Sequence, residues 1–361
     1  MKFICELSGI GGILGIPLHK RSHCISALCS RHGAGILGGF TVNNVHLFKL
    51  ILVAFLVCFP YERLKAQSVV QLRKTGETWE LTRDGEPYFI RGVGGTGSLS
   101  FLKQLGGNSI RTWSVEDAER TLDAAYAEGV TVCVGMWLEH ERHGFDYQDQ
   151  ARVQQQKRRC LDSVKRLKDH PAVLMWGIGN EMEGNGKDPA IWKAVEEIAE
   201  EIKSLDPNHP TMTVIAELGE GENKIRAIEE HCPSIDVIGV NSYGGITTLA
   251  SRFKNAKVSK PFVITEHGPA GPWEVGKTSW DSPIEASSTE KAKLYASGYE
   301  ASVASQAGLC LGAYSFLWGH KQETTATWFG MLLPDGSRLA AVDVISSAWT
   351  GKPPANRCPE I

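Results

Sequence analysis

The stretch Pro171-Ala-Val-Leu-Met-Trp-Gly-Ile-Gly-Asn-Glu-Met-Glu183 decides the fold. Its apolar run, residues 173–178, has no helical amphipathicity and is typical of a strand buried on both faces, as in a parallel sheet. The run ends in a glycine followed by Asn180 and Glu181, so an amide and a carboxylate stand where a buried strand meets solvent. In a (β/α)8 barrel this end of the strand is the rim that carries the active site.

A second stretch, Lys260-Pro-Phe-Val-Ile-Thr-Glu-His-Gly268, repeats this pattern. Residues 262–265 form its apolar run, and Glu266 stands at the end. An acidic residue at one strand end is common and proves little. Two parallel strands that each deliver a carboxylate to the same rim predict a pair of acids that face each other across a cleft.

The composition favours one soluble-type α/β domain. The chain has 361 residues, 38 glycines, 10 tryptophans and a net charge of −3. One α/β barrel of about 250 residues accounts for most of this length. No basic cluster indicates a nucleic-acid partner. The histidines do not follow the His-Glu-x-x-His spacing of zinc hydrolases, so neither a metal nor another cofactor is expected.

The N-terminal region differs from the rest. Residues 47–59 are apolar apart from Lys49, a length typical of a signal peptide and shorter than the ~20 residues of a spanning helix. We predict a signal peptide over 42–67, translation starting near Val42, and a mis-annotated or disordered extension over 1–41; a membrane anchor is the alternative. Without residues 1–66 the chain has 31 basic and 39 acidic residues, a net charge of −8. We expect a secreted or periplasmic monomer that touches a membrane only through the export signal or an anchor.

After this region, strands and helices alternate. Residues 69–90 contain two turn signals, the second an Asp-Gly, and predict a β-hairpin at the barrel floor. The following repeats of strand, polar rim residue and helix predict a single (β/α)8 TIM barrel domain over 68–361. The expected strands are 88–93, 109–113, 130–138, 173–178, 211–216, 235–240, 262–265 and 309–317, and the expected helices are 98–105, 117–128, 149–168, 188–205, 223–230, 246–255, one within 283–306 and one near 340–348.

Five cysteines lie beyond the N-terminal region, an odd number whose spacing fits no zinc site. Cys133 and Cys310 fall in apolar strands and are expected to be buried as small hydrophobic residues. One disulfide is possible, but the sequence does not select the pair.

Two carboxylates in an aromatic-lined groove fit glycoside hydrolysis. One carboxylic acid protonates the leaving oxygen, while the other carboxylate attacks the anomeric carbon or activates water. Tryptophans at strand ends can pack against the apolar faces of sugar rings, although core packing is the alternative for each of them. Among them, Trp318 at the end of the eighth strand is the preferred sugar platform, and Trp137 at the end of the third is a further candidate.

These motifs also carry a family resemblance. Trp-Gly-Ile-Gly-Asn180-Glu181 and Ile-Thr-Glu266-His-Gly resemble the fourth and seventh strands of the clan A retaining glycoside hydrolases. Over residues 88–349 the chain is most similar to the catalytic TIM barrel of glycoside hydrolase family 2, without that family's β-sandwich domains. Residues 315–319 and 328–331 also resemble bacterial β-1,3-glucan-cleaving enzymes and glucanosyltransferases.

The resemblance implies a role for each matching residue. Glu181 would be the acid/base and Glu266 the nucleophile, held by the Tyr243 hydroxyl and kept ionised by Arg111. Asn180 would bind the sugar 2-hydroxyl. A floor ion pair for Arg111 and plain packing for Tyr243 remain open. Looser candidates for substrate contacts are Glu139, His140 and His267.

The expected protein is therefore an exported retaining β-glycoside hydrolase that cleaves O-glycosidic bonds in a β-linked oligo- or polysaccharide by a two-glutamate double displacement. A β-glucanosyltransferase and a non-catalytic carbohydrate-binding barrel are the alternatives. The missing sandwich domains leave a family 2 substrate range in doubt.

Overall fold

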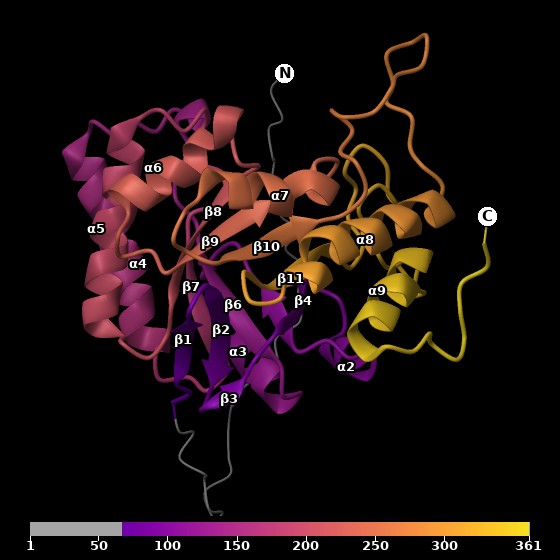
Figure 1. The fold of residues 1–361 in the computed structure, drawn as a ribbon, viewed down its shortest axis with the longest axis horizontal. Helices are drawn as coiled ribbons and strands as arrows, with labels where there is room; N and C mark the ends of the chain where they lie inside the picture. Colours follow the sequence, from indigo (N-terminus) through magenta and orange to yellow (C-terminus); the bar gives the residue numbers. More distant parts are fainter. Residues whose placement is uncertain (1–66, 361) are drawn as a thin grey trace, which may run out of the picture. The chain divides into compact units, whose positions relative to one another are not determined.

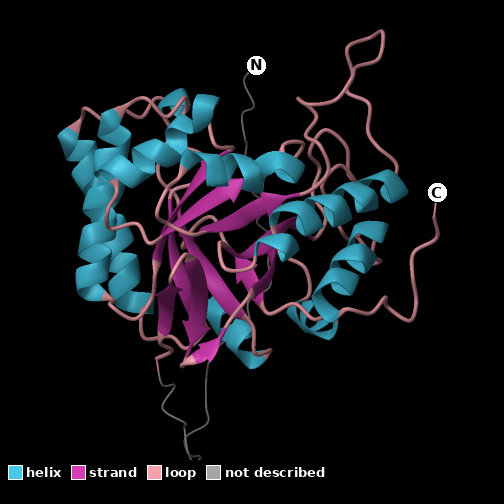
Figure 2. Ribbon diagram, in the orientation of Figure 1, coloured by secondary structure: helices cyan, strands magenta, loops and turns pink. Residues whose placement is uncertain are grey.

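The structure of the protein, a computed structural model, describes residues 67–360. The predicted extension and almost all of the predicted signal peptide lie outside these residues. Strands form the centre and helices surround them (Figure 2). No helix in the described part of the chain is long and apolar enough to cross a membrane.

Eight parallel strands close into a barrel, in the spatial order β10-β11-β4-β5-β6-β7-β8-β9. This confirms the predicted (β/α)8 barrel. Strand ends at the carboxyl side share one rim, so residues that follow different strands meet there. The barrel strands are β4 (Ile90–Gly95), β5 (Ser109–Arg111), β6 (Thr131–Met136), β7 (Val173–Ile178), β8 (Thr211–Ala216), β9 (Val237–Asn241), β10 (Phe262–His267) and β11 (Cys310–Trp318).

Helices follow the strands around the outside of the barrel (Figure 1). Their starts follow capping chemistry: the Asp149 side chain accepts from two backbone N–H groups of α4, and Asp188 caps α5, whose first residue is Pro189. The helices are α2 (Leu99–Gln104), α3 (Ala118–Ala127), α4 (Gln150–Leu167), α5 (Pro189–Leu205), α6 (Asn223–His231), α7 (Ile246–Ala256), α8 (Ser288–Ser302) and α9 (Ala340–Thr350), with short 3-10 turns η1 (Glu141–His143), η2 (Glu220–Glu222) and η3 (Ala304–Gln306).

The predicted N-terminal hairpin is present and closes the floor of the barrel. Antiparallel strands β1 (Val70–Thr75) and β2 (Thr78–Arg83) pair along their length, and β3 (Glu86–Pro87) adds a short third strand. Val70 and Leu81 are buried in one apolar cluster with side chains from inside the barrel. Removing this apolar surface from water stabilises the closed end opposite the rim.

All six side chains of β7 are buried, as are all nine of β11, which agrees with the uninterrupted apolar runs of their sequences. The cysteines at 133, 160, 232, 310 and 358 are unpaired, and all but the last are buried. Cys133 and Cys310 thus pack as small hydrophobic residues, as expected.

Candidate active site

The chain turns sharply where β7 reaches the rim. Gly179 has φ +76°, and an added Cβ there would meet the Met182 sulfur at 2.4 Å, so the position requires glycine. Glu181 also has a left-handed backbone, φ +52°, which is rare for a residue with a side chain and costs conformational energy. Its backbone N–H donates to Val214 O at 2.9 Å, so the neighbouring strand β8 holds the turn in place. Strain of this kind is concentrated at functional sites.

Glu266, at the end of β10, accepts three hydrogen bonds from the ends of two other strands, β5 and β9. Arg111 Nη1 donates to its Oε1 at 2.8 Å and Trp113 Nε1 donates to the same oxygen at 2.7 Å. The Tyr243 hydroxyl donates to Oε2 at 2.7 Å. An ionised carboxylate is an acceptor only, so this surrounding of donors suits the charged form and fixes its orientation.

A continuous set of hydrogen bonds joins the two glutamates. Arg111 Nη2 donates to Asn180 Oδ1 at 2.6 Å, next to its contact with Glu266. Asn241 Nδ2 donates to the same Asn180 oxygen at 3.1 Å and to Glu181 Oε1 at 2.7 Å. Asn241 is also the Cα partner of Glu266 in the pairing of β9 and β10. The carboxylates of Glu181 and Glu266 therefore lie at the same mouth of the barrel.

The two acids have different environments. Burial raises the pKa of Glu181 above its usual range, and the nearby charge of Glu266 raises it further, whereas the hydrogen bond from Asn241 lowers it. Burial and the Glu266 charge raise the pKa of Tyr243 well above its usual value, so its phenol keeps the proton that it donates to Glu266. Glu181 is thus the carboxyl group whose surroundings favour the protonated form, whereas Glu266 accepts three hydrogen bonds.

Trp137 and His140 lie together after β6. Their rings stack with centroids 4.8 Å apart and an interplanar angle of 22°, and Trp137 is 38% exposed. His140 is 1% exposed, and the Asn180 backbone is the only polar group of the described residues that faces its ring nitrogens. Burial, and then the charges of Arg142 and His143, lower the pKa of His140 to about 4, so the imidazole is neutral at pH 7. The structure therefore leaves Trp137 accessible to a substrate, while His140 is buried beside it.

The structure contradicts the sugar-platform role for Trp318. Its side chain is 1% exposed and packs on Phe101 of α2 with ring centroids 5.7 Å apart. The indole N–H donates to Ser98 O at 3.2 Å. The register between β11 and β4 shifts between Phe316 and Trp318, so the two residues do not share one face as i and i+2 normally do. Trp318 is a core residue, and it is Phe316 that lies at the site.

Two looser candidates make contacts with residues other than the two glutamates. His267 is buried in the barrel wall, with Nε2 2.9 Å from Ser315 Oγ and its ring against Tyr295. Burial lowers its pKa to about 3. The Glu139 carboxylate lies 3.7 Å from Arg159 at the surface. Neither side chain contacts Glu181 or Glu266 directly.

Sequence reasoning missed Asn241 as a site residue and did not single out Trp113. Both stand at or just beyond strand ends, the same signal that selected Asn180 and Glu266, so the rule could have found them. It also missed an aromatic cluster beside Glu266, formed by Phe316, Leu317, Trp328 and Phe329 with Trp113, Tyr243 and Val275 against it.

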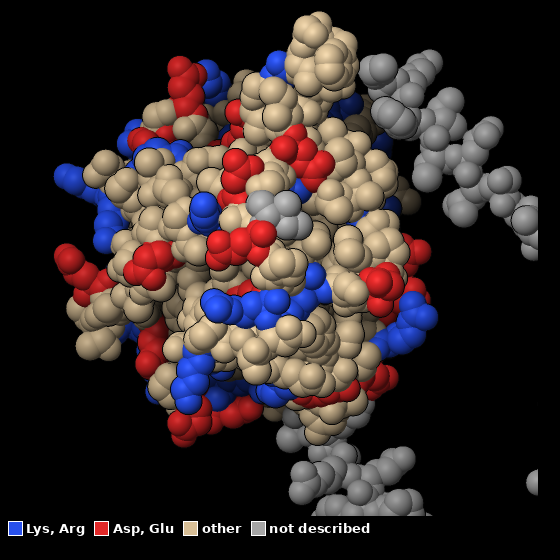
Figure 3. Space-filling model, turned by 90° about the vertical axis from the view of Figure 1, so that its right-hand side faces the viewer, with Lys and Arg blue, Asp and Glu red and all other residues tan. Residues whose placement is uncertain are grey.

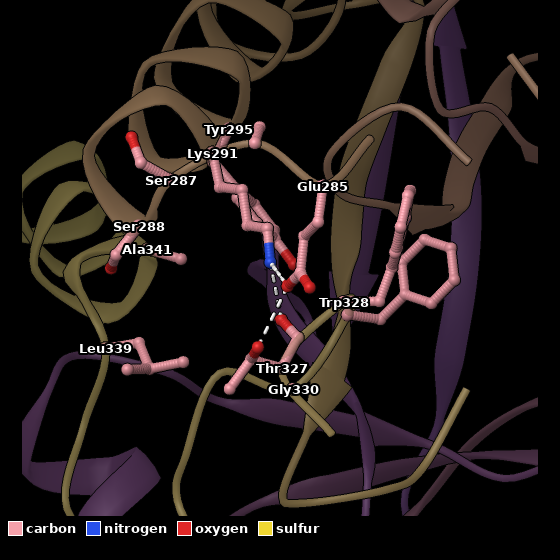
Figure 4. Close-up of a pocket in the computed structure, with 12 residues that line it drawn as sticks. Glu285, Ser287, Ser288, Lys291, Tyr295, Thr327, Trp328, Gly330, Leu339 and Ala341 are labelled. Carbon is pink, nitrogen blue, oxygen red and sulfur yellow. Dashed lines mark hydrogen bonds and ion pairs between the residues drawn. The ribbon is translucent and has the colours of Figure 1, made fainter. Parts of the chain in front are cut away.

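A pocket of about 310 Å³ lies next to this cluster and is lined by Trp328, Phe329 and the start of α8 (Figure 4). Inside it the Lys291 ammonium contacts Glu285 and donates to Thr327 O at 2.7 Å. These contacts tie α8 to the segment that carries the aromatic residues. Neither Glu181 nor Glu266 lines this pocket, so it lies behind the aromatic cluster and not in the cleft.

Among residues 67–360, no group of three or more His, Cys, Asp or Glu side chains is arranged to hold a metal ion. The arrangement instead offers a proton donor, a carboxylate, hydrogen-bonding amides and aromatic faces. These are the groups that glycoside hydrolysis requires.

Comparison with known proteins gives the family. The family model described as "Glycosyl hydrolases family 2, TIM barrel domain" matches residues 97–282. A β-glucuronidase of Homo sapiens is 26% identical over 219 residues, which cover 51% of this chain and 31% of that protein. A β-glucuronidase of Canis lupus familiaris is 26% identical over 285 residues, 65% of this chain and 42% of that protein.

Solved structures show the same fold. A β-D-glucuronidase from Dictyoglomus thermophilum has a TM-score of 0.60 at 18% identity, over 79% of this chain and 54% of that one. A GH2 β-galacturonidase from Eisenbergiella tayi, bound to galacturonate, has a TM-score of 0.59 at 20% identity, over 78% of this chain and 54% of that one. This chain spans less than half the length of the curated relatives and just over half of the solved chains.

Proposed function

The chain belongs to family 2 of the glycoside hydrolases, and on that premise we propose that it is a retaining β-glycosidase that acts on a β-linked oligo- or polysaccharide. The observation that carries this proposal is the asymmetric pair of glutamates: one with a raised pKa, and one that accepts three hydrogen bonds, at the same barrel rim. Retention requires such a pair to act on one anomeric centre.

In the first step, Glu181 gives its proton to the glycosidic oxygen while Glu266 attacks the anomeric carbon. The bond to the leaving group breaks, and a glycosyl ester forms on Glu266. Glu181, now ionised, takes a proton from water, and that water displaces Glu266. The Oδ1 atom of Asn180 is used by Arg111 and Asn241, which leaves its Nδ2 group to donate to the substrate, and we assign it to the sugar 2-hydroxyl.

We propose that the sugar bound at the site is neutral. The relatives are named for glucuronides and galacturonides, whose carboxylates favour a cationic partner. Here the guanidinium of Arg111 is already engaged by Glu266 and Asn180 and is buried. We therefore expect faster cleavage of an aryl β-glucoside or β-mannoside than of the matched aryl β-glucuronide.

The test uses Glu181→Gln and Glu266→Gln in the full chain, with aryl β-glycosides as substrates. Each variant should lose several powers of ten in kcat/KM, because Glu181→Gln removes the proton transfer and Glu266→Gln removes the covalent catalysis, while thermal unfolding stays cooperative. With a 2,4-dinitrophenyl leaving group, which needs no proton, only Glu266→Gln should still lose the glycosylation step. Proton NMR of the first product should show retained β configuration. Full activity in either variant, or an inverted product, would contradict the proposal.

We also propose that the protein is exported. Glucanosyl transfer is the alternative to hydrolysis. N-terminal sequencing of the mature protein tests the predicted signal peptide over 42–67. Product analysis over time separates hydrolysis from glucanosyl transfer, since transfer yields products longer than the substrate.

A further inference from the structure

The loop between β10 and α8 projects from the rim of the barrel (Figure 1, upper right, in orange). Its outer part, residues 276–284, forms a small hairpin of its own. Thr278 N donates to Ser282 O at 2.8 Å and Ile284 N donates to Gly276 O at 2.9 Å. The Lys277 ammonium lies 2.8 Å from the Asp281 carboxylate across the turn. We call residues 269–284 the arm.

The arm exposes large apolar side chains. Trp273 is 68% exposed, Trp280 is 75% exposed and Ile284 is 55% exposed. A single exposed apolar side chain is ordinary on a protein surface, but two tryptophans on one projecting loop beside a cleft mark a binding surface. Trp280, the outer tryptophan, lies at the tip of the arm, in the turn that the Lys277–Asp281 ion pair closes.

The inner tryptophan is continuous with the catalytic cleft. The Trp273 ring meets Tyr243 edge-on with centroids 5.8 Å apart, and Tyr243 in turn holds the nucleophile. The ring centroid of Phe329, in the aromatic cluster, lies 6.3 Å from that of the same indole. A ligand that leaves the cleft on this side therefore passes over Trp273.

The base of the arm is held in place. The Glu274 carboxylate accepts from Gly244 N at 3.0 Å and from Gly271 N at 2.6 Å. The Trp273 indole lies over Gly271, where an added Cβ would come within 2.4 Å of the ring. The indole is thus positioned before any ligand arrives, which lowers the entropy cost of binding.

The arm carries little net charge. Its charged residues are Glu274, Lys277 and Asp281; the first is used at the base and the other two pair with each other. The projecting top of the molecule is mostly tan in Figure 3, without a basic patch on the side that faces the viewer. Flat indoles on a segment without excess positive charge suit the apolar faces of a neutral sugar chain rather than an anionic polymer or an anionic lipid surface.

We infer that the arm is a second carbohydrate-binding surface, on which a neutral β-linked polysaccharide lies where it leaves the cleft. Trp273 is the inner platform and Trp280 the outer one. This inference rests on the proposed function and deepens it, because it makes the substrate a polymer that spans several sugar units rather than a short glycoside.

Binding is measured first, without any need for catalysis. In full-length Glu181→Gln protein, retardation in native gels that contain laminarin, glucomannan or xylan reports the affinity for each neutral polymer. We expect retardation by at least one of them, reduced about fivefold or more by Trp280→Ala and further by Trp273→Ala. The matched control is Leu294→Ala, an apolar residue on α8 that is 39% exposed, which should leave retardation unchanged. No retardation by any of the three polymers, or equal retardation of the tryptophan variants, would overturn the inference.

Kinetics then separate this inference from the proposed function. In the wild-type background, Trp280→Ala should raise KM on the bound polymer about fivefold or more and leave kcat/KM on an aryl monoglycoside within twofold. If Trp280→Ala lowered kcat/KM equally on the polymer and on the aryl monoglycoside, the inference about the arm would be contradicted. A wild-type protein that is inactive on every glycoside but is retarded by a polymer would contradict only the proposed function. A blue shift of tryptophan fluorescence with phosphatidylglycerol vesicles that Trp280→Ala abolishes would assign the arm to a membrane instead and overturn the inference.

Discussion

At the scale of single residues, Glu181 and Glu266 have the same side chain, and their neighbours make their affinities for a proton different. Glu266 accepts hydrogen bonds from three donors, whereas Glu181 accepts one, from Asn241, among the described residues and is partly buried close to another carboxylate. Moving a carboxylate out of water without enough donors favours its protonated form. The sequence shows two glutamates at two strand ends, but only the geometry says which of them keeps a proton.

This difference gives a prediction for Asn241→Ala. The Asn241 amide lowers the pKa of Glu181 by donating to its charged form, so its removal should raise that pKa. Glu181 must be protonated for the first step, and kcat/KM falls as pH rises through its pKa. The alkaline limb of the pH profile should therefore move to higher pH.

The control for this prediction is Ser242→Ala, the next residue along the chain, whose hydroxyl contacts Glu217 and not Glu181. Its alkaline limb should stay in place. A limb that is unmoved or displaced to lower pH in Asn241→Ala would show that another group sets it.

At the scale of elements, a buried ion pair holds the loop that carries Glu181. The Glu183 carboxylate, two residues beyond Glu181, accepts from Lys224 Nζ at 2.7 Å and from Ala216 N at 3.1 Å. The two charged side chains are 1% and 9% exposed. The pair links the β7–α5 loop to the start of α6 and to the end of β8, and these contacts hold the loop in place.

Lys224→Met should destabilise the protein by about 3–5 kcal/mol, because it leaves a buried carboxylate without its charged partner. The double variant Glu183→Gln/Lys224→Met should recover a large part of that loss, since neither charge is then buried alone. Denaturant unfolding of the singles and the double gives the coupling between them. Arg226→Met is the matched control on the same helix: its ion pair with Glu222 is half exposed, and the expected loss is about 0–1 kcal/mol. Equal losses for the two single variants at 224 and 226 would refute a special role for the buried pair.

At the scale of the whole molecule, the sequence predicted the barrel because buried parallel strands read as uninterrupted apolar runs. The bounds of β7 and β8 agree with the predicted 173–178 and 211–216. Bounds were less accurate for β4, predicted over 88–93 and found over Ile90–Gly95, where the strand runs into glycines. The direction of the Trp318 side chain was not predictable, because the register shift in β11 breaks the alternation on which such a prediction depends.

The barrel also separates stability from chemistry, since its floor and its rim lie at opposite ends. Leu81 of the hairpin is buried at the floor with Val70 and the inner barrel side chains. Leu81→Ala should lower the free energy of unfolding by about 2–5 kcal/mol through lost apolar burial and the cavity left behind. Below its unfolding temperature the variant should keep kcat on an aryl glycoside within twofold, because no residue of the site moves. The control is Glu80→Ala at the exposed neighbouring residue, which should change neither the free energy of unfolding nor kcat. A loss of kcat in folded Leu81→Ala protein would show that the floor is coupled to the rim.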